Sequence, residues 1–366
     1  MGALGFVILA YLSCFWSLAP FRTFKHVTEE VLLNLTSFGA AAFWAAQASE
    51  RNLRRLFKVA LASFLWVLGL YLFFFFWWHF TGAPLFPLDR GPKGPLSAQT
   101  LFFLLPDLHD IILNRQNLAS YLLFPSSMAL AYFITAPSGK KFLKGFFWFL
   151  LFGGFLFVTA KRSALLGLFI GGIFGAFLAR RYQALLILFL IVISLISLVF
   201  FTPLKRYFIR ENFRLFLSGN RKEWVRAGSI PLRYYGLPFY LKYIARHPLK
   251  GIGFGRFNIK TNPKVKALAQ KAHLGHAHNV WINLALYLGI PGAFFFLLFL
   301  GAKSFIFWQA FQRAGPGNWL LLGFIIYLVA FWVRYQFDDS FRYATSALYY
   351  LNTGLGVGLS LRQKEK

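Results

Sequence analysis

The stretch ALLILFLIVISLISLVFFT, residues 184–202, runs for nineteen residues without one charged side chain. An α-helix rises 1.5 Å per residue, so about 20 apolar residues cross the hydrocarbon layer of a bilayer. Over all 366 residues, hydrophobic side chains make up 58% and charged side chains only 14%. These proportions lie outside those of soluble globular domains. The stretch therefore predicts one membrane-spanning helix of a polytopic membrane protein.

Further apolar runs of similar length lie on both sides of this stretch and predict an all-α fold with about ten transmembrane helices. The predicted spans are 3–20, 31–48, 57–80, 118–135, 143–160, 163–179, 184–202, 279–300, 318–336 and 343–361. We expect three parts: an N-terminal bundle of seven helices at 1–202, a loop with amphipathic helices at 203–275, and a C-terminal bundle of three helices at 276–366.

The orientation follows from the short loops, because Lys and Arg concentrate on the cytoplasmic side. Basic clusters precede the third span at 51–58, precede the fifth at 140–144 and join the sixth and seventh at 180–181. Both termini fall on the same side in an alternating ten-helix chain. We therefore expect both termini in the cytoplasm, and the 203–275 loop and 336–342 turn on the outer side, which in a Gram-negative cell would be the periplasm.

The loop at 203–275 is strongly basic. It contains sixteen Lys and Arg against Glu211 and Glu223, and so carries half of the net charge of +28. These residues either solvate the loop and touch membrane lipid headgroups, or some of them bind a polyanion such as a diphosphate, to which Arg offers two parallel donors. No nucleic-acid-binding motif accompanies the charge, so nucleic acid is not an expected partner.

Part of this loop has the pattern of a folded segment. In PLRYYGLPFYLKYIARHPLKGIGFGRF, residues 231–257, the apolar side chains are spaced as in an amphipathic interfacial helix. They are Tyr235, Phe239, Leu241, Tyr243 and Ile244. Pro248 and Gly251 end the predicted helix. GIGFG lacks the spacing of a dinucleotide-binding fingerprint and predicts a tight turn.

Polar side chains also stand at two predicted helix starts. Arg162, in TAKRSALLG, begins the sixth span; it either reaches to the membrane surface or holds an anionic group at the mouth of a cavity. His276, His278 and Asn279 precede the eighth span, which Asn279 could cap. The three histidines of HLGHAH could bind zinc or copper. The surrounding positive charge and the lack of Cys in the loop oppose a metal site.

Three segments together resemble the O-antigen ligase and polymerase superfamily, most closely the O-antigen ligases. They are TAKRSALLG around Arg162, LRYYGLPFYLKYIARHPLKGIGFGRF from Leu232 to Phe257, and HAHNVWINLALYLGIPG from His276 to Gly292. Arg233 and His247 have the fourteen-residue separation that the family shows before its His-Pro pair. The family's functional positions match Arg162, Arg233 and His278.

The resemblance implies a GT-C-type inverting glycosyltransferase of lipopolysaccharide biosynthesis, without cofactor or required metal. It would move a glycan from undecaprenyl diphosphate to a hydroxyl of the lipid A core. His278 suits a general base, because imidazole titrates near neutral pH, and Arg162 and Arg233 suit stabilisation of the leaving diphosphate. His276, Asn279, Asp338 and Asp339 are further candidate substrate-binding residues; the two aspartates could instead pair with Arg334 or Arg342.

Other functions share part of this pattern. An O-antigen polymerase or a protein-directed oligosaccharyltransferase would use the same site on another acceptor. A transporter of lipid-linked sugars would show internal repeats and helices broken in mid-membrane beside charged residues. No convincing repeat is found, and the candidate charges gather at one face. A scaffold with a lipid-binding basic loop would leave the order of the three motifs unexplained.

Overall fold

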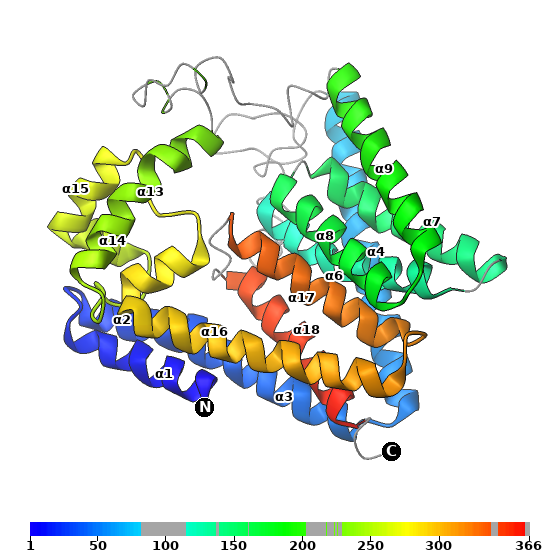
Figure 1. Ribbon diagram of the computed structural model, residues 1–366, viewed down its shortest axis with the longest axis horizontal. Coiled ribbons are helices and arrows are strands. Elements are labelled where there is room, and N and C mark those ends of the chain that lie inside the picture. Colours follow the sequence, from blue (N-terminus) through cyan, green and yellow to red (C-terminus); the bar gives the residue numbers. More distant parts are fainter. Residues whose placement is uncertain are drawn as a thin grey trace. The chain divides into compact units, whose positions relative to one another are not determined.

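The structure, a computed structural model, describes residues 1–81, 115–136, 139–159, 161–202, 229–337 and 343–362, together with residues 217, 223 and 225. All regular elements in these residues are helices (Figure 1). They are α1 (Gly2–Leu12), η1 (Ser13–Phe15), α2 (Pro20–Val27), η2 (Thr28–Leu32), α3 (Leu33–Gln47), α4 (Glu50–Thr81), α6 (Arg115–Thr135), α7 (Lys140–Val158), α8 (Arg162–Leu178), α9 (Tyr182–Phe201), α13 (Ser229–Arg246), α14 (Phe257–Thr261), α15 (Pro263–Lys271), α16 (Val280–Ala314), α17 (Trp319–Tyr335) and α18 (Tyr343–Arg362). The predicted all-α fold class is confirmed.

Three of the described helices are long and apolar enough to cross a membrane: α6 over Leu118–Thr135, α9 and α16. Shorter apolar helices cover Gly2–Phe15, Arg162–Leu178 and Trp319–Tyr335. The predicted spans all overlap helices, although the first is interrupted at η1 and the eighth continues to Ala314 instead of ending near residue 300. The count of ten spans and the three-part division stay predictions.

The chain forms two compact units. Unit 1 comprises Met1–Thr36, Ile193–Ser304 and Arg334–Phe341, and unit 2 comprises Ser37–Val192, Phe305–Val333 and Arg342–Lys366. Both units are therefore assembled from segments that lie far apart in the sequence.

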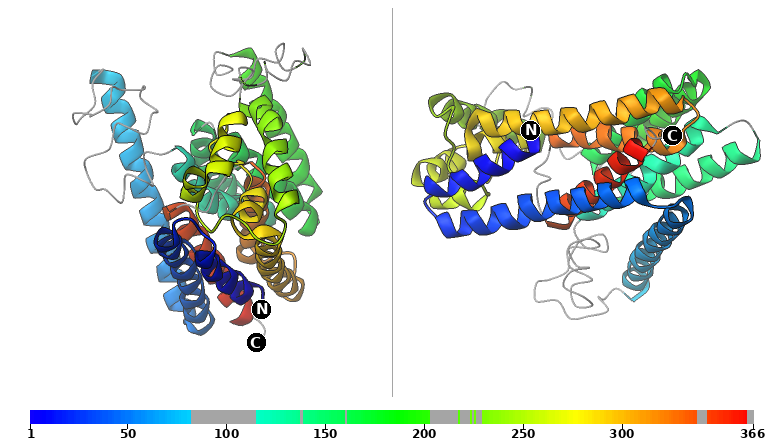
Figure 2. Two further views of the ribbon diagram at one scale, coloured as in Figure 1. Left: turned by 90° about the vertical axis from the view of Figure 1, so that its left-hand side faces the viewer. Right: turned by 90° about the horizontal axis from the view of Figure 1, so that it is seen from below.

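In unit 1, α1 packs along α16 (Figures 1 and 2). Glycines make the close approach possible, since a Cβ on Gly2 would lie 2.7 Å from the backbone nitrogen of Phe299. Phe6 is buried between Phe254, at a ring-centroid distance of 6.4 Å, and Phe296, at 5.5 Å. The segment before α14 is thus held against α1 and α16.

A break in the helical backbone of α16 allows the segment before α14 to bind to it. Gly289 has non-helical backbone angles, φ +77° and ψ 178°, and Pro291 has no N–H to donate to the carbonyl of Tyr287 four residues earlier. Two N–H groups of the glycine-rich turn replace the lost helical donors. Ile252 donates to Leu286 O and Gly253 to Tyr287 O, each at 3.0 Å. The predicted turn is confirmed, and it is bound to the broken helix.

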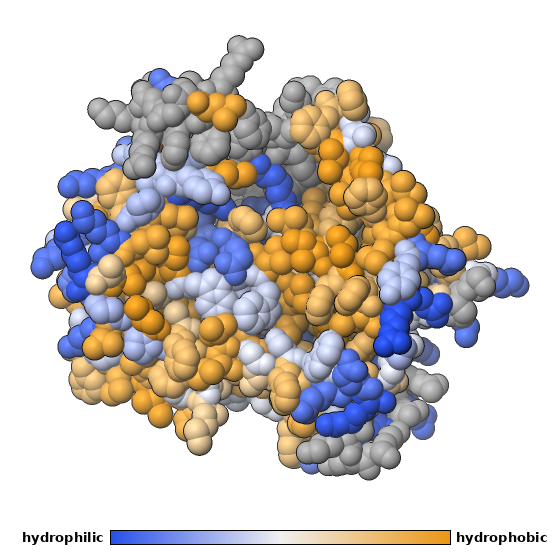
Figure 3. All heavy atoms as spheres, in the orientation of Figure 1, coloured by the Kyte–Doolittle hydropathy of each residue, from blue (hydrophilic) through white to orange (hydrophobic). Residues whose placement is uncertain are grey.

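Two apolar helices, α6 in unit 2 and α9, whose first half belongs to unit 2, differ in burial. In α6, 94% of the membrane-span window is buried, whereas only 17% of the α9 window is. Glycines on α8 at spacings of four residues, Gly167 and Gly171, lie against the backbone of α17, as is common where transmembrane helices pack closely. Apolar side chains cover the surface over α8 and α9 (Figure 3). A groove there is lined by Ile170, Ile173, Phe174, Phe177 and Leu185.

Candidate active site

Three distant segments of unit 1 meet at the ends of α13, α16 and α17. The guanidinium of Arg233, on α13, donates from Nη1 to the carbonyl of Phe337 at 2.7 Å. The side chain of Asn279, just before α16, donates from Nδ2 to the carbonyl of Gln336 at 3.3 Å. Residues 336–337 directly follow α17, so two hydrogen bonds hold the end of that helix.

Asn279 also caps α16, as the sequence predicted. Its Oδ1 accepts a hydrogen bond from the backbone N–H of Ile282 at 3.1 Å, which satisfies one of the free donors in the first turn of the helix. A second amide holds the loop before it, because Asn283 Oδ1 accepts from the N–H of Ala277 at 3.1 Å. The approach of the chain to α16 is therefore fixed by Asn279, the residue before the helix, and by Asn283 in its first turn.

The two histidines of this loop lie in contact, with ring centroids 3.7 Å apart and planes inclined by 40°. His276 is buried, with 5% of its surface exposed, while His278 is half-buried. His278 has φ +51°, in the left-handed region that residues other than glycine seldom adopt. Such backbone strain persists only where surrounding contacts hold it, and here the cap at the next residue is one such contact.

Arg256 belongs to the same region, although the sequence did not single it out. A Cβ on Gly275 would lie 3.4 Å from Arg256 Nη2, so the guanidinium reaches the histidine loop. Tyr240, on α13, donates its hydroxyl to the carbonyl of Leu274 at 2.5 Å. Burial raises the pKa of Tyr240 to about 12, and the charge of Arg256 opposes this shift. The hydroxyl is therefore a permanent donor near neutral pH.

A sequence signal for Arg256 exists in the turn that precedes it. Gly253 and Gly255 have φ values of +97° and +109°, which suit glycine. The turn they form delivers Arg256 to the N-cap position of α14. This position, directly after a predicted glycine-rich turn, is the feature of the sequence that indicates Arg256 as a candidate site residue.

Arg162 lies in unit 2, as the first residue of α8. Its side chain is half-buried, and the first turn of α8 contains no acidic residue. The start of a helix carries partial positive charge, which, like a guanidinium, attracts anionic groups. The prediction that a helix starts at Arg162 is confirmed, while its convergence with Arg233 and His278 stays a prediction.

The remaining predicted residues have different outcomes. Asp338 and Asp339 lie outside the described residues, as does most of the basic segment from 203 to 228. Arg334, which the sequence offered as their partner, is 1% exposed. Within the described part of the chain, no group of three or more His, Cys, Asp or Glu side chains is placed to hold a metal ion.

The predicted helix at the interface is α13, which ends at Arg246 as expected. The structure shows which side of α13 packs within unit 1, while its place at the membrane interface stays a prediction. Tyr240 and Ile244, four residues apart, are buried, but Leu241 is 50% exposed. A helix turns 100° per residue, so Leu241 lies well away from the direction in which Tyr240 points.

Apolar helices, basic side chains at helix ends and a paired-histidine loop together define an all-helical membrane protein with a polar site at its helix ends. Residues 147–297 match the family model of O-antigen ligase. The match includes all three motifs that carry the predicted resemblance to the O-antigen ligase superfamily, and it confirms that resemblance. The family implies a membrane glycosyltransferase-like enzyme that acts on lipid-linked glycans. None of the curated proteins compared matches the sequence.

Proposed function

We propose that this protein is an O-antigen ligase that transfers a glycan from undecaprenyl diphosphate to a hydroxyl of the lipid A core, at the periplasmic face of the inner membrane and with inversion of the anomeric carbon. The observation that carries the proposal is the site of unit 1. Within the matched region, Arg233 and the His276–His278 loop belong to segments joined through residues 336–337 and through the Tyr240 hydrogen bond.

In the proposed reaction, His278 takes the proton of the acceptor hydroxyl as its oxygen attacks the anomeric carbon. The new carbon–oxygen bond forms as the bond to the diphosphate breaks, and undecaprenyl diphosphate leaves with the electron pair. The charge that develops on the diphosphate is stabilised by fixed guanidinium groups, the role assigned to Arg162 and Arg233. A positioned general base is worth roughly 10² to 10⁴ in rate.

His276 and Asn279 are assigned to positioning. His276 contacts the ring of His278 and is the more buried of the two, which suits it to restrict the orientation of the base. Asn279 fixes the start of α16. Asp338 and Asp339 directly follow the segment held by Arg233 and Asn279, and we propose that they contact the acceptor or the base.

The test is reconstitution in liposomes with undecaprenyl-diphosphate-linked glycan and rough lipopolysaccharide. We expect wild-type transfer to fall by roughly 10² to 10⁴ in His278→Ala. His273→Ala is the matched control, because His273 lies in the same loop and has the same φ of +51°. Arg246→Ala, a change to an exposed basic residue on the same helix as Arg233, is the control for Arg233→Ala.

Equal transfer by His278→Ala and His273→Ala would remove the base assignment. Transfer to a second lipid-linked glycan, with none to lipopolysaccharide, would identify a polymerase. Movement of the lipid-linked glycan across the bilayer without glycosyl transfer would identify a transporter.

A further inference from the structure

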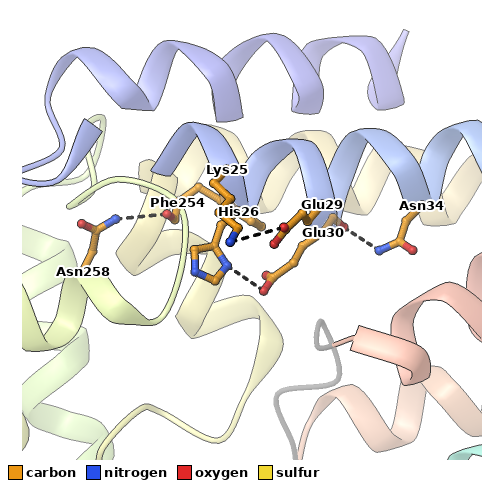
Figure 4. A network of polar contacts seen from close by, with 7 residues as sticks. All are labelled: Lys25, His26, Glu29, Glu30, Asn34, Phe254 and Asn258. Atoms are coloured by element: carbon orange, nitrogen blue, oxygen red, sulfur yellow. Dashed lines mark hydrogen bonds and ion pairs between the residues drawn. The ribbon is translucent and has the colours of Figure 1, made fainter. Parts of the chain in front are cut away.

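A second polar cluster lies in unit 1, at the junction of α2 and η2 (Figure 4). His26 Nδ1 lies 2.9 Å from Glu30 Oε1, and the side chains are only 28% and 14% exposed. An ionised carboxylate can only accept a hydrogen bond, so Nδ1 carries the proton. In the neutral imidazole this leaves Nε2 as an acceptor, next to a carboxylate with further lone pairs.

The helix geometry at Glu30 is unusual. Residues Thr28–Leu32 form a π-helical turn between α2 and α3. Such turns are rare and occur frequently at functional sites. Asn34 ties the turn to α3 by donating from Nδ2 to the carbonyl of Glu30 at 2.8 Å.

The imidazole of His26 is contacted on a ring face as well as at Nδ1. The ring of His26 stacks on Phe257 of α14 at a centroid distance of 4.9 Å and an angle of 19°. Asn258, the next residue, locks α14 to the N-terminal segment: its Oδ1 accepts from Ser17 at 3.0 Å, and its Nδ2 donates to Thr23 at 3.1 Å. With Nδ1 and the ring face occupied, Nε2 is the edge of His26 that remains for a ligand.

The first turn of α14 links this cluster to the candidate active site. Phe257 contacts His26, while the preceding Arg256 reaches Gly275, the residue before His276. The two neighbouring side chains of α14 thus contact the His26–Glu30 pair and the histidine loop. The pair and the histidine loop are therefore in the same unit and are connected through two adjacent residues, Arg256 and Phe257.

The negative charge of the Glu30 carboxylate limits the kind of ligand that the pair can bind. Arg233 and Arg256 suit a diphosphate, but the carboxylate of Glu30 repels one. A half-buried carboxylate offers hydrogen-bond acceptors, and the Nε2 edge of the imidazole offers a further polar contact; both suit the hydroxyl groups of a sugar. We propose that His26 and Glu30 form a subsite that accepts hydrogen bonds from sugar hydroxyls of a glycan substrate, separate from the cationic groups. This inference rests on the proposed glycosyl transfer.

The chain contains a matched control. Lys25 and Glu29 form a pair of the same spacing one residue earlier, 3.8 Å apart, but their side chains are 64% and 49% exposed. In the reconstituted assay, we expect Glu30→Gln to raise the KM for one glycan substrate by about tenfold, the effect of losing one charge-assisted hydrogen bond, with kcat little changed. Glu29→Gln should leave both KM values unchanged.

The substrate whose KM rises identifies the source of the hydroxyl. A rise for rough lipopolysaccharide assigns the subsite to the acceptor, and a rise for the undecaprenyl-diphosphate-linked glycan assigns it to the donor. Glu30→Gln kinetics that equal those of Glu29→Gln for both substrates would overturn the subsite.

A second measurement tests the subsite where Glu30→Gln does not fold, or where the wild-type protein shows no transfer. The wild-type protein is labelled with ¹⁵N-histidine, and the His26 signals are assigned by their absence in His26→Phe. Saturating rough lipopolysaccharide or lipid-linked glycan should shift the His26 Nε2 signal. If neither shifts it, the subsite is wrong even where transfer occurs; if wild type shows no transfer but the signal shifts, the proposed function fails alone.

Discussion

Asn279 makes two hydrogen bonds with different partners, and substitutions can remove one without the other. Its Oδ1 caps α16 at Ile282, and its Nδ2 holds the carbonyl of Gln336. Asn279→Ser keeps a good cap and loses the second hydrogen bond, whereas Asn279→Ala loses both. Because the cap directly follows His278, the two variants test whether the position of the proposed base depends on the start of the helix.

The expected magnitudes follow from these contacts. Loss of a cap costs about 1 kcal/mol, and loss of a partly exposed neutral hydrogen bond costs about 0.5–1.5 kcal/mol. His278 stays at φ +51° against a preference of about 1–2 kcal/mol for right-handed backbone. Losing about 2 kcal/mol of support is therefore enough to release it. We expect kcat to fall roughly 30-fold in Asn279→Ala and about 3-fold in Asn279→Ser.

The assay is initial-rate transfer of lipid-linked glycan in liposomes, with thermal unfolding in detergent followed by tryptophan fluorescence. KM should stay nearly constant, because the base contributes to the transition state more than to binding. Wild-type kcat in Asn279→Ala would refute the link between cap and base. A kcat for Asn279→Ser as low as that for Asn279→Ala would show that the Gln336 contact, and not the cap, is decisive.

Three further predictions concern stability, pH and charge. Gly289→Ala should lower the unfolding temperature, because φ is +77° and the new Cβ would lie 2.6 Å from the carbonyl carbon of Leu249; Gly301→Ala, with open space around its Cβ, is the control. The folded-state pKa of Tyr240 is raised to about 12, so its contribution to stability is complete below pH 10 and is lost as pH rises towards 12. Denaturant titrations of Tyr240→Phe should show a smaller loss over that window than those of wild type. Arg233→Lys should keep the charge but lose the planar donor set, and we expect about a tenfold lower kcat/KM at unchanged unfolding temperature, measured as above.

Local features of the site could be predicted from the sequence. The helix start at Arg162, the cap at Asn279 and the turn around Gly253 each depend on a few neighbouring residues, and the structure contains all three. Hydropathy likewise predicted the helices, since a span requires only a run of apolar residues.

Contacts between distant segments could not be predicted in the same way. The hydrogen bond from Arg233 to Phe337 joins residues 104 positions apart, and nothing near either residue indicates the other. The stacking of His26 on Phe257 is similar, because many aromatic residues were available in a chain that is 20% aromatic. Which side of α13 is buried also could not be predicted, because the helix is apolar on more than one side: Tyr240 and Ile244 are buried, whereas Leu241 is exposed.

Irregular backbone and polar side chains coincide in unit 1 for a physical reason. In an apolar environment, each backbone group released by a break in a helix needs another partner. The break at Gly289 releases carbonyls that bind the turn leading to Arg256, and the π-helical turn at Thr28–Leu32 contains Glu30. The left-handed residue His278 precedes the cap of α16. The break in α16 and the left-handed residue thus place Arg256 and His278 at helix ends, whereas the π-helical turn changes the direction of Glu30 within a continuous helical run.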